Sequence, residues 1–343
     1  MTRACIIGAG SSGIIAAQIL TSKGIDVDCF ELGSQVGGLW RYDNDNGQGS
    51  AYRSLHINTS REMMQYAAYP MPESLPDYPS HWQIAEYFDA FVDHFGLRDK
   101  ITFNTEVIRV EPAEGSGAGR YAVTIRTRGA TSEPEVRYYD HVGRGVRHRE
   151  LRHRHRGRVL PCGRAHLPRD APWRVHPAQV PLRRTDRSPH QLAVGARAVP
   201  GAEAGNEGDA APGGGEDDRL RLAPTGSRRP RGPPDDQAIL SADDNHVDLY
   251  RRVVTPDRPG LYFIGLIQPI GAIMPLAEEQ CHWVAELIEG TVRLPSPAEL
   301  RAQIAAYDAA LRKRYVRSKR HTIQVDAHAY LAELRKERTS HRV

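Results

Sequence analysis

The chain has 343 residues, a formal net charge of +4 and 40% hydrophobic residues. This length allows two domains and a substantial core, and no apolar run reaches the roughly 18 residues that a membrane-spanning helix needs. A strand is expected from residue 4, where a secretory leader would place its charged and apolar regions. We therefore expect a soluble, cytoplasmic protein without a membrane partner. The four cysteines form no CxxC pair, and the histidines are single or lie in an arginine-rich stretch, so no metal site is expected.

The first predicted unit is a strand, a glycine-rich turn and a helix. Residues 4–13 read Ala-Cys-Ile-Ile-Gly-Ala-Gly-Ser-Ser-Gly, and the helix is expected over residues 11–20. Gly8 allows the sharp turn, Gly10 lets a phosphate approach the backbone, and Gly13 lets the helix pack closely on the strand. Because the helix N-terminus offers free N–H groups and a positive dipole end, the unit is typical of a dinucleotide pyrophosphate site.

A second strand is expected over residues 27–31 and ends in an acid. Glu31 lies eighteen residues past Gly13, and a carboxylate about 20 residues on is what a ribose 2′-hydroxyl needs. The alternative is a chance GxGxxG in a glycine-rich chain. We favour the dinucleotide site because the strand, the helix, the second strand and the acid all fall where that site requires them.

A helix and three strands are expected next. Ser80 is suited to cap a helix over residues 81–95, which carries an apolar stripe, and Gly96 is suited to end it. Alternating apolar and polar residues then predict three strands. These strands are expected over residues 101–110, 121–127 and 135–142.

The stretch 141–235 differs from the rest of the chain. It holds 19 arginines, no lysine and 10 acids, and it holds 12 of the 24 prolines. The other residues carry 27 basic and 32 acidic side chains, so the basic character belongs to this stretch alone. It lacks period-two and period-3.6 apolar spacing and so has no face to bury. A nucleic-acid patch at residues 147–158 is one interpretation, which we disfavour because no aromatic platform accompanies the arginines; a disordered linker is another.

A frameshift explains this composition best, because Arg, Pro, Gly, Ala and His codons are what a GC-rich gene yields out of frame. One permitted coding of residues 141–149, with a single G deleted from its third codon, reads His-Val-Val-Val-Ala-Cys-Ala-Thr-Gly. That is an apolar strand continuing residues 138–140. The nucleotide sequence of the gene decides this hypothesis.

Regular patterning resumes near residue 239. Residues 260–266 predict a buried strand, which leads through Gly271 into a helix over residues 275–289 with Pro275 in its first turn. A further helix is expected over residues 296–315, and a last helical stretch over residues 328–336.

An ordered series of motifs strongly resembles the flavin-containing monooxygenases of bacterial type. The similarity covers about residues 1–142 and 238–325, roughly two thirds of the chain. The motifs are Gly8-Ala-Gly-Ser-Ser-Gly13, Glu31, Gly37-Gly-Leu-Trp40, Ser54-Leu-His-Ile-Asn-Thr-Ser60, Glu62-Met-Met-Gln-Tyr66, Tyr69-Pro-Met-Pro72 and Phe263-Ile-Gly-Leu266.

The resemblance implies an α/β fold in which the N- and C-terminal segments build one Rossmann-like FAD-binding domain. Residues that would hold the ADP half of FAD are Gly8, Gly10, Ser12, Gly13 and Glu31. Gly38, Leu39 and Trp40 would form the second loop against the cofactor. The alternative role of Trp40 is to pack in the hydrophobic core. Val107 resembles the position whose backbone meets the adenine, and Gln268 the position near the isoalloxazine.

Asn58 resembles the family's active-site asparagine, and the resemblance also places Asn58 and Thr59 among the cofactor-binding residues. In this family NADPH reduces FAD, and dioxygen then gives a flavin hydroperoxide that oxygenates a soft nitrogen or sulfur centre of a small molecule. An amide suits that site because it can donate and accept hydrogen bonds without changing charge. The alternative role of Asn58 is that of a turn residue capping Thr59-Ser60.

The middle segment departs from the family, whose second GxGxxG domain binds NADPH. No GxGxxG opens a strand–helix unit within residues 141–235, so the NADP-binding domain is expected to be missing or disrupted. We divide the chain into FAD-binding parts at 1–142 and 238–343 and a low-complexity segment at 143–237, and we expect the chain as written to be inactive or barely folded. Alternative functions are an inactive flavin-binding remnant and a Baeyer–Villiger monooxygenase. The sequence does not decide whether the chain forms a homodimer.

Overall fold

The computed structural model describes residues 1–47, 49, 51–113, 120–131, 133–145, 248–314 and 323–343. These residues belong to one compact unit that contains both ends of the chain. The predicted low-complexity segment 143–237 lies outside the described residues except for its first three. The interpretations of residues 147–158 as a nucleic-acid patch and of the later stretch as a linker also lie outside them.

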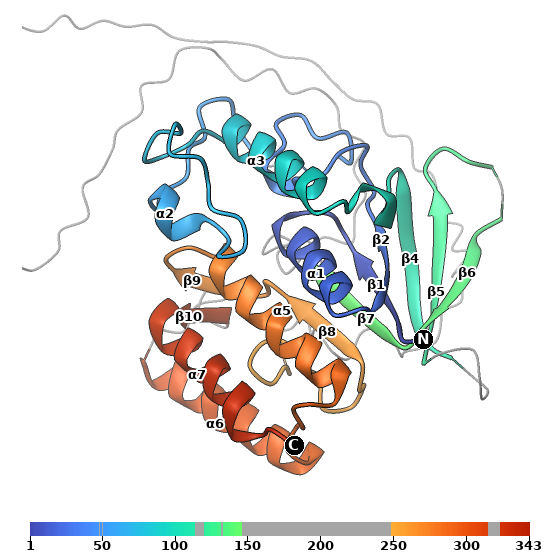
Figure 1. The fold of residues 1–343 in the computed structure, drawn as a ribbon. Helices are drawn as coiled ribbons and strands as arrows, with labels where there is room; N and C mark the ends of the chain where they lie inside the picture. The colour runs from blue at the N-terminus through green and yellow to red at the C-terminus, as the bar shows by residue number, and fades with distance from the viewer. Residues whose placement is uncertain (48, 50, 114–119, 132, 146–247, 315–322) are drawn as a thin grey trace, which may run out of the picture. The chain divides into compact units, whose positions relative to one another are not determined.

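A five-stranded parallel sheet with strand order β3-β2-β1-β7-β8 forms the centre of this unit (Figure 1). Its strands are β1 (Arg3–Ile7), β2 (Asp26–Phe30), β3 (Ile101–Thr102), β7 (His141–Gly145) and β8 (Leu261–Ile264). Strand β7 pairs with β1 on one side and with β8 on the other. The C-terminal segment therefore completes the sheet that the N-terminal segment begins, which confirms the predicted Rossmann-like domain built from both.

Parallel sheets are covered on both faces, and here α1 (Ser11–Ser22) and α5 (Met274–Glu289) contact one face of the sheet. The other helices are α2 (Arg61–Met64), α3 (His81–His94), α6 (Pro297–Arg314) and α7 (Ala327–Ser340), with 3-10 turns η1 (Gly38–Trp40) and η2 (Arg98–Lys100). Helix α1 packs on α5, and α5 packs on α7. No helix among the described residues is long and apolar enough to cross a membrane.

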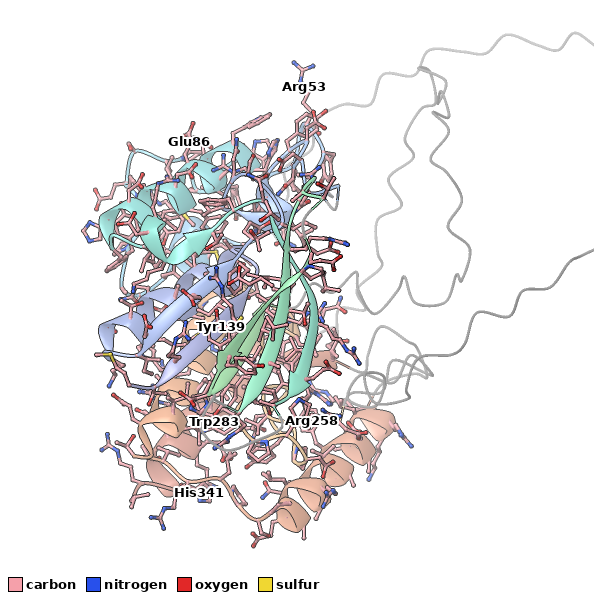
Figure 2. The ribbon with its side chains drawn as sticks, turned by 90° about the vertical axis from the view of Figure 1, so that its right-hand side faces the viewer. Arg53, Glu86, Tyr139, Arg258, Trp283 and His341 are labelled. Carbon is pink, nitrogen blue, oxygen red and sulfur yellow. The ribbon has the colours of Figure 1, made fainter. Side chains whose placement is uncertain are left out.

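An antiparallel sheet covers the other face. It consists of β4 (Thr105–Pro112), β5 (Tyr121–Thr127) and β6 (Glu135–Tyr139). Its buried side chains form a cluster with Cys5, Phe30 and Val142 of the parallel sheet. Tyr139, labelled in Figure 2, joins the two sheets, since its hydroxyl donates to Asp28 at 2.7 Å. A further pair, β9 (Gln268–Ile270) with β10 (Gln324–Asp326), is parallel.

Two predicted strands are each divided, and both divisions have a local cause. The strand expected over residues 101–110 is interrupted at Asn104, which has a left-handed φ of 52°. The strand expected over residues 135–142 ends at Tyr139, and β7 begins at His141. Between them the N–H of Asp140 donates to the Arg3 carbonyl at 3.0 Å, while its side chain accepts from the Arg3 N–H at 2.9 Å. In each case the chain passes from one sheet to the other.

The predicted helices are confirmed with small shifts at their ends. Ser80 and Gln83 form a capping box at the start of α3, and Gly96 follows it with a φ of 60°. Pro275 lies in the first turn of α5, and Ser296 accepts from the Glu299 N–H at the start of α6. Helix α7 is longer than the predicted stretch at both ends.

Candidate functional site: two glycine turns at the N-terminus of α1

The first glycine turn is shaped by its own backbone. Gly8 has a φ of 93°, which favours glycine, and its N–H donates to the Phe30 carbonyl at 2.8 Å. A Cβ at Gly13 would overlap the carbonyl oxygen of Gly8. These two glycines are therefore required by the fold itself, before any ligand is considered.

The second glycine turn lies directly against the first. The N–H of Gly37 donates to the Ala9 carbonyl at 2.9 Å, and the side chain of Asn44 donates to the Gly38 carbonyl at 2.9 Å. A Cβ at Gly10 would lie 3.7 Å from the Cα of Gly38, which is an ordinary contact. The absence of a side chain at Gly10 is therefore not demanded by packing, and it leaves the space between the turns open.

Helix α1 begins at this space without a side-chain cap. Its N-cap is Gly10, and its first turn carries no acid. The first N–H groups of a helix have no acceptor within it, and the helix dipole places partial positive charge there. The start of α1 is consequently suited to an anion such as a pyrophosphate.

The C-terminal segment meets the first turn of α1 at Ser12. Gly265, which follows β8, has a φ of 76°, and a Cβ built on it would overlap the hydroxyl of Ser12. The N–H of Gly265 donates to Gln280 of α5 at 2.8 Å, and Gln280 donates to the Tyr330 hydroxyl at 2.7 Å. Gln280 is fully buried. This amide was not anticipated from the sequence, although a glutamine on the buried face of a helix is a signal that could have identified it.

Glu31 lies beside the first turn and is only 1% exposed. One carboxylate oxygen accepts from the Ala9 N–H at 2.7 Å. The other accepts from the Gly33 N–H at 2.9 Å and from the Asn46 side chain at 3.4 Å. The predicted ribose acid therefore also binds the backbone on both sides of the turn.

Leu39 and Trp40 are half-buried in η1, and Trp40 packs against the main core. The next residue, Arg41, donates to the Val36 carbonyl at 2.7 Å and pairs with Asp89 of α3. This attachment fixes the second turn to α3. The contact of Trp40 with the core agrees with the alternative role, and its face toward a cofactor stays a prediction.

Asn58 lies on a separate segment and is exposed. No described residue forms a hydrogen bond with its side chain. Ser60, and not Asn58, caps the following helix α2 by accepting from the Met63 N–H. Thr59 instead directs its hydroxyl to the sulfur of Met64 at 3.7 Å. The capping role considered for Asn58 is therefore absent among the described residues, and its catalytic role stays a prediction.

One guanidinium group and one carboxylate hold this segment, and neither was anticipated from the sequence. Arg61 donates to the carbonyls of Pro72, Glu73 and Leu75 at 2.6–3.1 Å. Glu278 of α5 accepts from the N–H groups of Ala67 and Ala68. Arg61 also pairs with its neighbour Glu62 at 2.9 Å, but the partners across the segment are backbone atoms, so no pairing of side-chain types in the sequence marks them.

Val107 and Gln268 lie at the edges of this arrangement. Val107 is beside an irregularity in the β4–β5 pairing, two residues after Thr105, whose N–H donates to the Glu31 carbonyl at 2.8 Å. Gln268 begins β9, three residues after Gly265, and pairs in register with Gln324. Direct contacts thus join the two glycine turns, Ser12 and Glu31, and Val107 and Gln268 lie two and three residues from Thr105 and Gly265 of this arrangement.

Thiol and metal chemistry receive no support. Among the described residues no group of three or more His, Cys, Asp or Glu side chains could hold a metal ion. Cys5, Cys29 and Cys281 are buried free thiols, and burial raises the pKa of each well above its ordinary value. Raised pKa values make these thiols unreactive.

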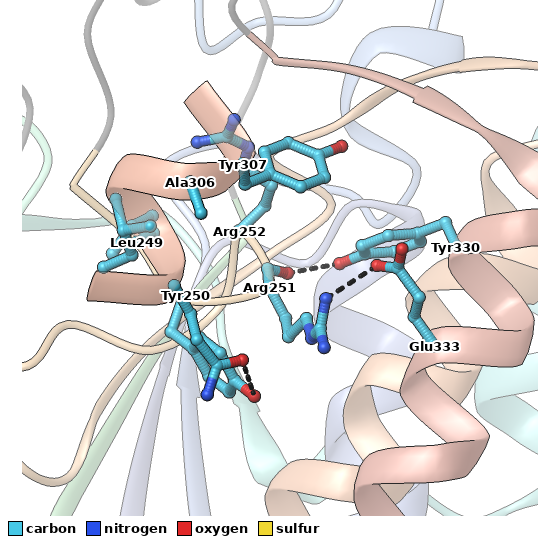
Figure 3. Close-up of a pocket in the computed structure, with 10 residues that line it drawn as sticks. Leu249, Tyr250, Arg251, Arg252, Ala306, Tyr307, Tyr330 and Glu333 are labelled. Carbon is cyan, nitrogen blue, oxygen red and sulfur yellow. Dashed lines mark hydrogen bonds and ion pairs between the residues drawn. The ribbon is translucent and has the colours of Figure 1, made fainter. Parts of the chain in front are cut away.

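A cavity of ≈ 220 Å³ lies between α6, α7 and the turn at residues 249–252 (Figure 3). Arg251 pairs with Glu333 at 2.8 Å and with Glu337 at 2.9 Å, and Arg252 pairs with Asp308 at 3.0 Å. Its described lining includes no residue of either glycine turn. We interpret these paired charges as anchors of the turn on the two helices.

Comparison with known proteins gives one consistent result. The family described as flavin-binding monooxygenase-like matches residues 1–142 and 233–340, extending beyond the resemblance noted above. Flavin-containing monooxygenase 5 of Oryctolagus cuniculus is 26% identical over 430 residues, which cover 94% of this chain and 80% of the rabbit protein. Dimethylaniline monooxygenase (N-oxide-forming) 2 of Mus musculus is 36% identical over 127 residues, 36% of this chain and 24% of the mouse protein.

A solved structure gives the same fold. S-allyl-L-cysteine S-oxygenase from Allium sativum is similar with a TM-score of 0.65 and 18% identity, over 99% of this chain and 89% of that one. The 430 residues aligned with the rabbit protein exceed the 343 of this chain, so the rabbit protein carries segments that this chain lacks.

Proposed function

This chain belongs to the flavin-binding monooxygenase-like family, and on that premise we propose that it binds FAD in the space between its two glycine turns. The proposal extends to flavin-dependent oxygenation of nitrogen or sulfur centres in small molecules, with NADPH and dioxygen as co-substrates. A nitrogen centre is also what the name of the mouse relative indicates for that protein.

The observation that carries the proposal is the pairing of the two turns at the uncapped start of α1. The first turn has open space at Gly10, and the N–H groups of Ser11 and Ser12 have no acceptor within the helix. The residues present therefore fit a diphosphate. When bound, FAD supplies the redox chemistry and the activation of dioxygen.

The chain's own residues would bind and orient that group. The backbone at Gly10 and Gly38 admits the diphosphate, and Glu31 has an acceptor direction left for a ribose hydroxyl, because a carboxylate offers about four. Trp40 supplies a flat wall that excludes water. Asn58 would orient the reacting groups by hydrogen bonds from its amide, which does not titrate.

A second candidate is a flavin-binding protein without turnover. It is favoured by one specific observation, the lack of a GxGxxG unit within residues 141–235. Without a nicotinamide site, hydride delivery to the cofactor has no binding place. This observation favours the second candidate for the chain as written, whereas membership of the family favours the first.

One experiment separates these candidates. The purified chain is titrated with FAD while flavin fluorescence is followed, and NADPH consumption is then measured with a thioether, a tertiary amine and a cyclic ketone. Saturable FAD binding without NADPH consumption supports the second candidate. NADPH consumption coupled to an N-oxide or sulfoxide establishes the first, a lactone from the ketone indicates Baeyer–Villiger chemistry, and a protein that does not bind FAD contradicts both proposals.

A further inference from the structure

Glu278 is a buried carboxylate whose partners are two consecutive backbone amides. It lies in the second turn of α5 and is 5% exposed. One oxygen accepts from the Ala67 N–H at 2.8 Å and the other from the Ala68 N–H at 3.2 Å. No described arginine, lysine or histidine forms an ion pair with it. Burying a charge is unfavourable unless it is hydrogen-bonded, so these two bonds account for its presence there.

The same segment is held on its other side by Tyr66. Its side chain is fully buried, and its hydroxyl donates to the Ser11 carbonyl in the first turn of α1 at 2.6 Å. Its ring packs against Phe91 and Tyr87 of α3. Packing of Tyr66 and the Tyr87 hydroxyl, which accepts from the Tyr66 N–H at 3.2 Å, hold residue 66, whereas the Ala67 and Ala68 side chains are exposed and contribute no packing of their own. The carboxylate of Glu278 holds these two residues by their N–H groups.

We propose that Glu278 is a positioning residue for the flavin site. Its carboxylate fixes residues 66–68 between α5 and the first turn of α1, so that Tyr66 supports the Ser11 carbonyl at the start of the anion-binding helix. Toward the N-terminus the same segment continues into α2 and the Asn58 bend, where Met64 is buried and contacts Thr59. Glu278 thereby sets the position of the diphosphate-binding turn and of Asn58 together. The inference rests on the proposed binding of FAD.

The test compares two neighbouring glutamates of α5. Glu278→Gln keeps the side-chain volume but replaces one acceptor oxygen with an NH₂ group that faces an N–H donor. We expect the resulting displacement of residues 66–68 to weaken FAD binding about tenfold, which corresponds to about 1.4 kcal/mol. Glu279→Gln is the matched control, because Glu279 is 8% exposed but pairs with Arg338 and Arg335 on α7, away from residues 66–68.

Two readouts separate positioning from simple stabilisation. The first is the FAD dissociation constant, measured well below the unfolding temperature; the second is hydrogen exchange at the amides of Ala67 and Ala68. Both change in Glu278→Gln, whereas Glu279→Gln lowers the unfolding temperature and leaves both unchanged. Equal FAD affinity in the two variants overturns the inference while leaving the proposed function intact. A wild-type chain that does not bind FAD contradicts the proposed function itself.

Tyr66→Phe keeps the test decisive if Glu278→Gln does not fold. This change retains the buried ring and removes only the bond to the Ser11 carbonyl. We expect weaker FAD binding, with an unfolding temperature near that of the wild type. Unchanged FAD affinity in this variant contradicts the role of residues 66–68 in supporting the turn.

Discussion

The carboxylate of Glu31 accepts a hydrogen bond from the Ala9 N–H at 2.7 Å, inside the first glycine turn. Its other oxygen accepts from the Gly33 N–H at 2.9 Å. The acid that the dinucleotide pattern assigns to a ribose therefore also joins the backbone at Ala9 to the backbone at Gly33. The side chain proposed for binding is thus also one that the fold uses.

Replacing this acid is expected to destabilise the protein even without a cofactor. In Glu31→Gln one oxygen becomes an NH₂ group facing a buried N–H donor, which leaves that donor unsatisfied. We expect the free energy of unfolding of the FAD-free protein to fall by about 2–3 kcal/mol. Urea unfolding monitored by circular dichroism measures this value. An unchanged midpoint would mean that Glu31 serves only the ligand.

Gly10 and Gly13 are expected to respond differently to alanine. A Cβ at Gly13 overlaps the Gly8 carbonyl, so Gly13→Ala disrupts the turn and lowers stability by several kcal/mol. A Cβ at Gly10 finds its nearest atom at 3.7 Å, so Gly10→Ala folds normally and loses FAD affinity by obstructing the diphosphate. Thermal unfolding and FAD titration of both variants check this contrast. Normal FAD binding by Gly10→Ala would place the diphosphate elsewhere.

The glycine turns could be predicted from sequence because their constraints are local. A left-handed φ at Gly8 and the close packing at Gly13 depend on residues a few positions apart, and so does the capping box of α3. The pairing of β7 with β8 was not predicted, since the family resemblance implied only that the N- and C-terminal segments build one domain. It could not be derived from periodicity, because both strands are short and the chain between them carries no regular pattern.

Contacts between distant segments could not be predicted in the same way. Glu278 and Ala67 are 211 positions apart, and the donor is a backbone N–H that every residue except proline possesses. The division of the strand at Asp140 was missed because an apolar run through Tyr138 and Tyr139 hides the transfer of the chain from one sheet to the other. Asp140, the acid that interrupts the apolar run, is the sequence feature that could have indicated this division.

Asn58 is expected to affect chemistry without affecting stability. Its side chain is exposed and has no hydrogen-bond partner among the described residues, so Asn58→Ala is expected to change the free energy of unfolding by less than about 0.5 kcal/mol. FAD affinity also stays near the wild-type value. In any form of the chain that catalyses oxygenation, we expect Asn58→Ala to lower the oxygenation rate. A clear loss of stability would show instead that Asn58 supports the loop.

His141 is expected to make stability depend on pH. Burial, with help from Arg120 and against the effect of Asp140, lowers the pKa of His141 to about 4, whereas an unfolded histidine titrates near about 6.5. Between these values the unfolded chain binds a proton that the folded chain does not. The contribution of neutral His141 to the free energy of unfolding is therefore fully present above about pH 6.5, and it is lost as the pH falls toward 4.

The size of this loss is about 1–3 kcal/mol, with the lower part of the range favoured because the ring is only partly buried. Unfolding midpoints of the wild type and His141→Gln are compared from pH 7 to pH 4. The difference between the two curves isolates His141 from the other titrating groups. Parallel curves would contradict the lowered pKa.

The central strand β7 contains two glycines that are expected to respond oppositely to valine. Gly143 lines an apolar cavity of ≈ 20 Å³ between the sheet and helices α1 and α5, and the atom nearest to a Cβ there is the Cys5 oxygen at 3.9 Å. A Cβ at Gly145 already lies 3.6 Å from Gly13 N, Ile7 O and Ser12 Cβ. Position 143 therefore has room for a branched side chain, whereas position 145 accepts a single methyl group.

Gly143→Val is expected to raise the free energy of unfolding by about 1–2 kcal/mol, because glycine in a strand interior is unfavourable and each buried methylene contributes about 0.8 kcal/mol. Gly145→Val lowers the free energy of unfolding, because its second methyl group collides with the first glycine turn. The frameshift hypothesis places valine at position 143 and alanine at position 145, which are the sizes that this packing accepts. Denaturant unfolding of both variants tests the packing, and a gene in which no single-base shift restores an apolar strand after Asp140 contradicts the frameshift.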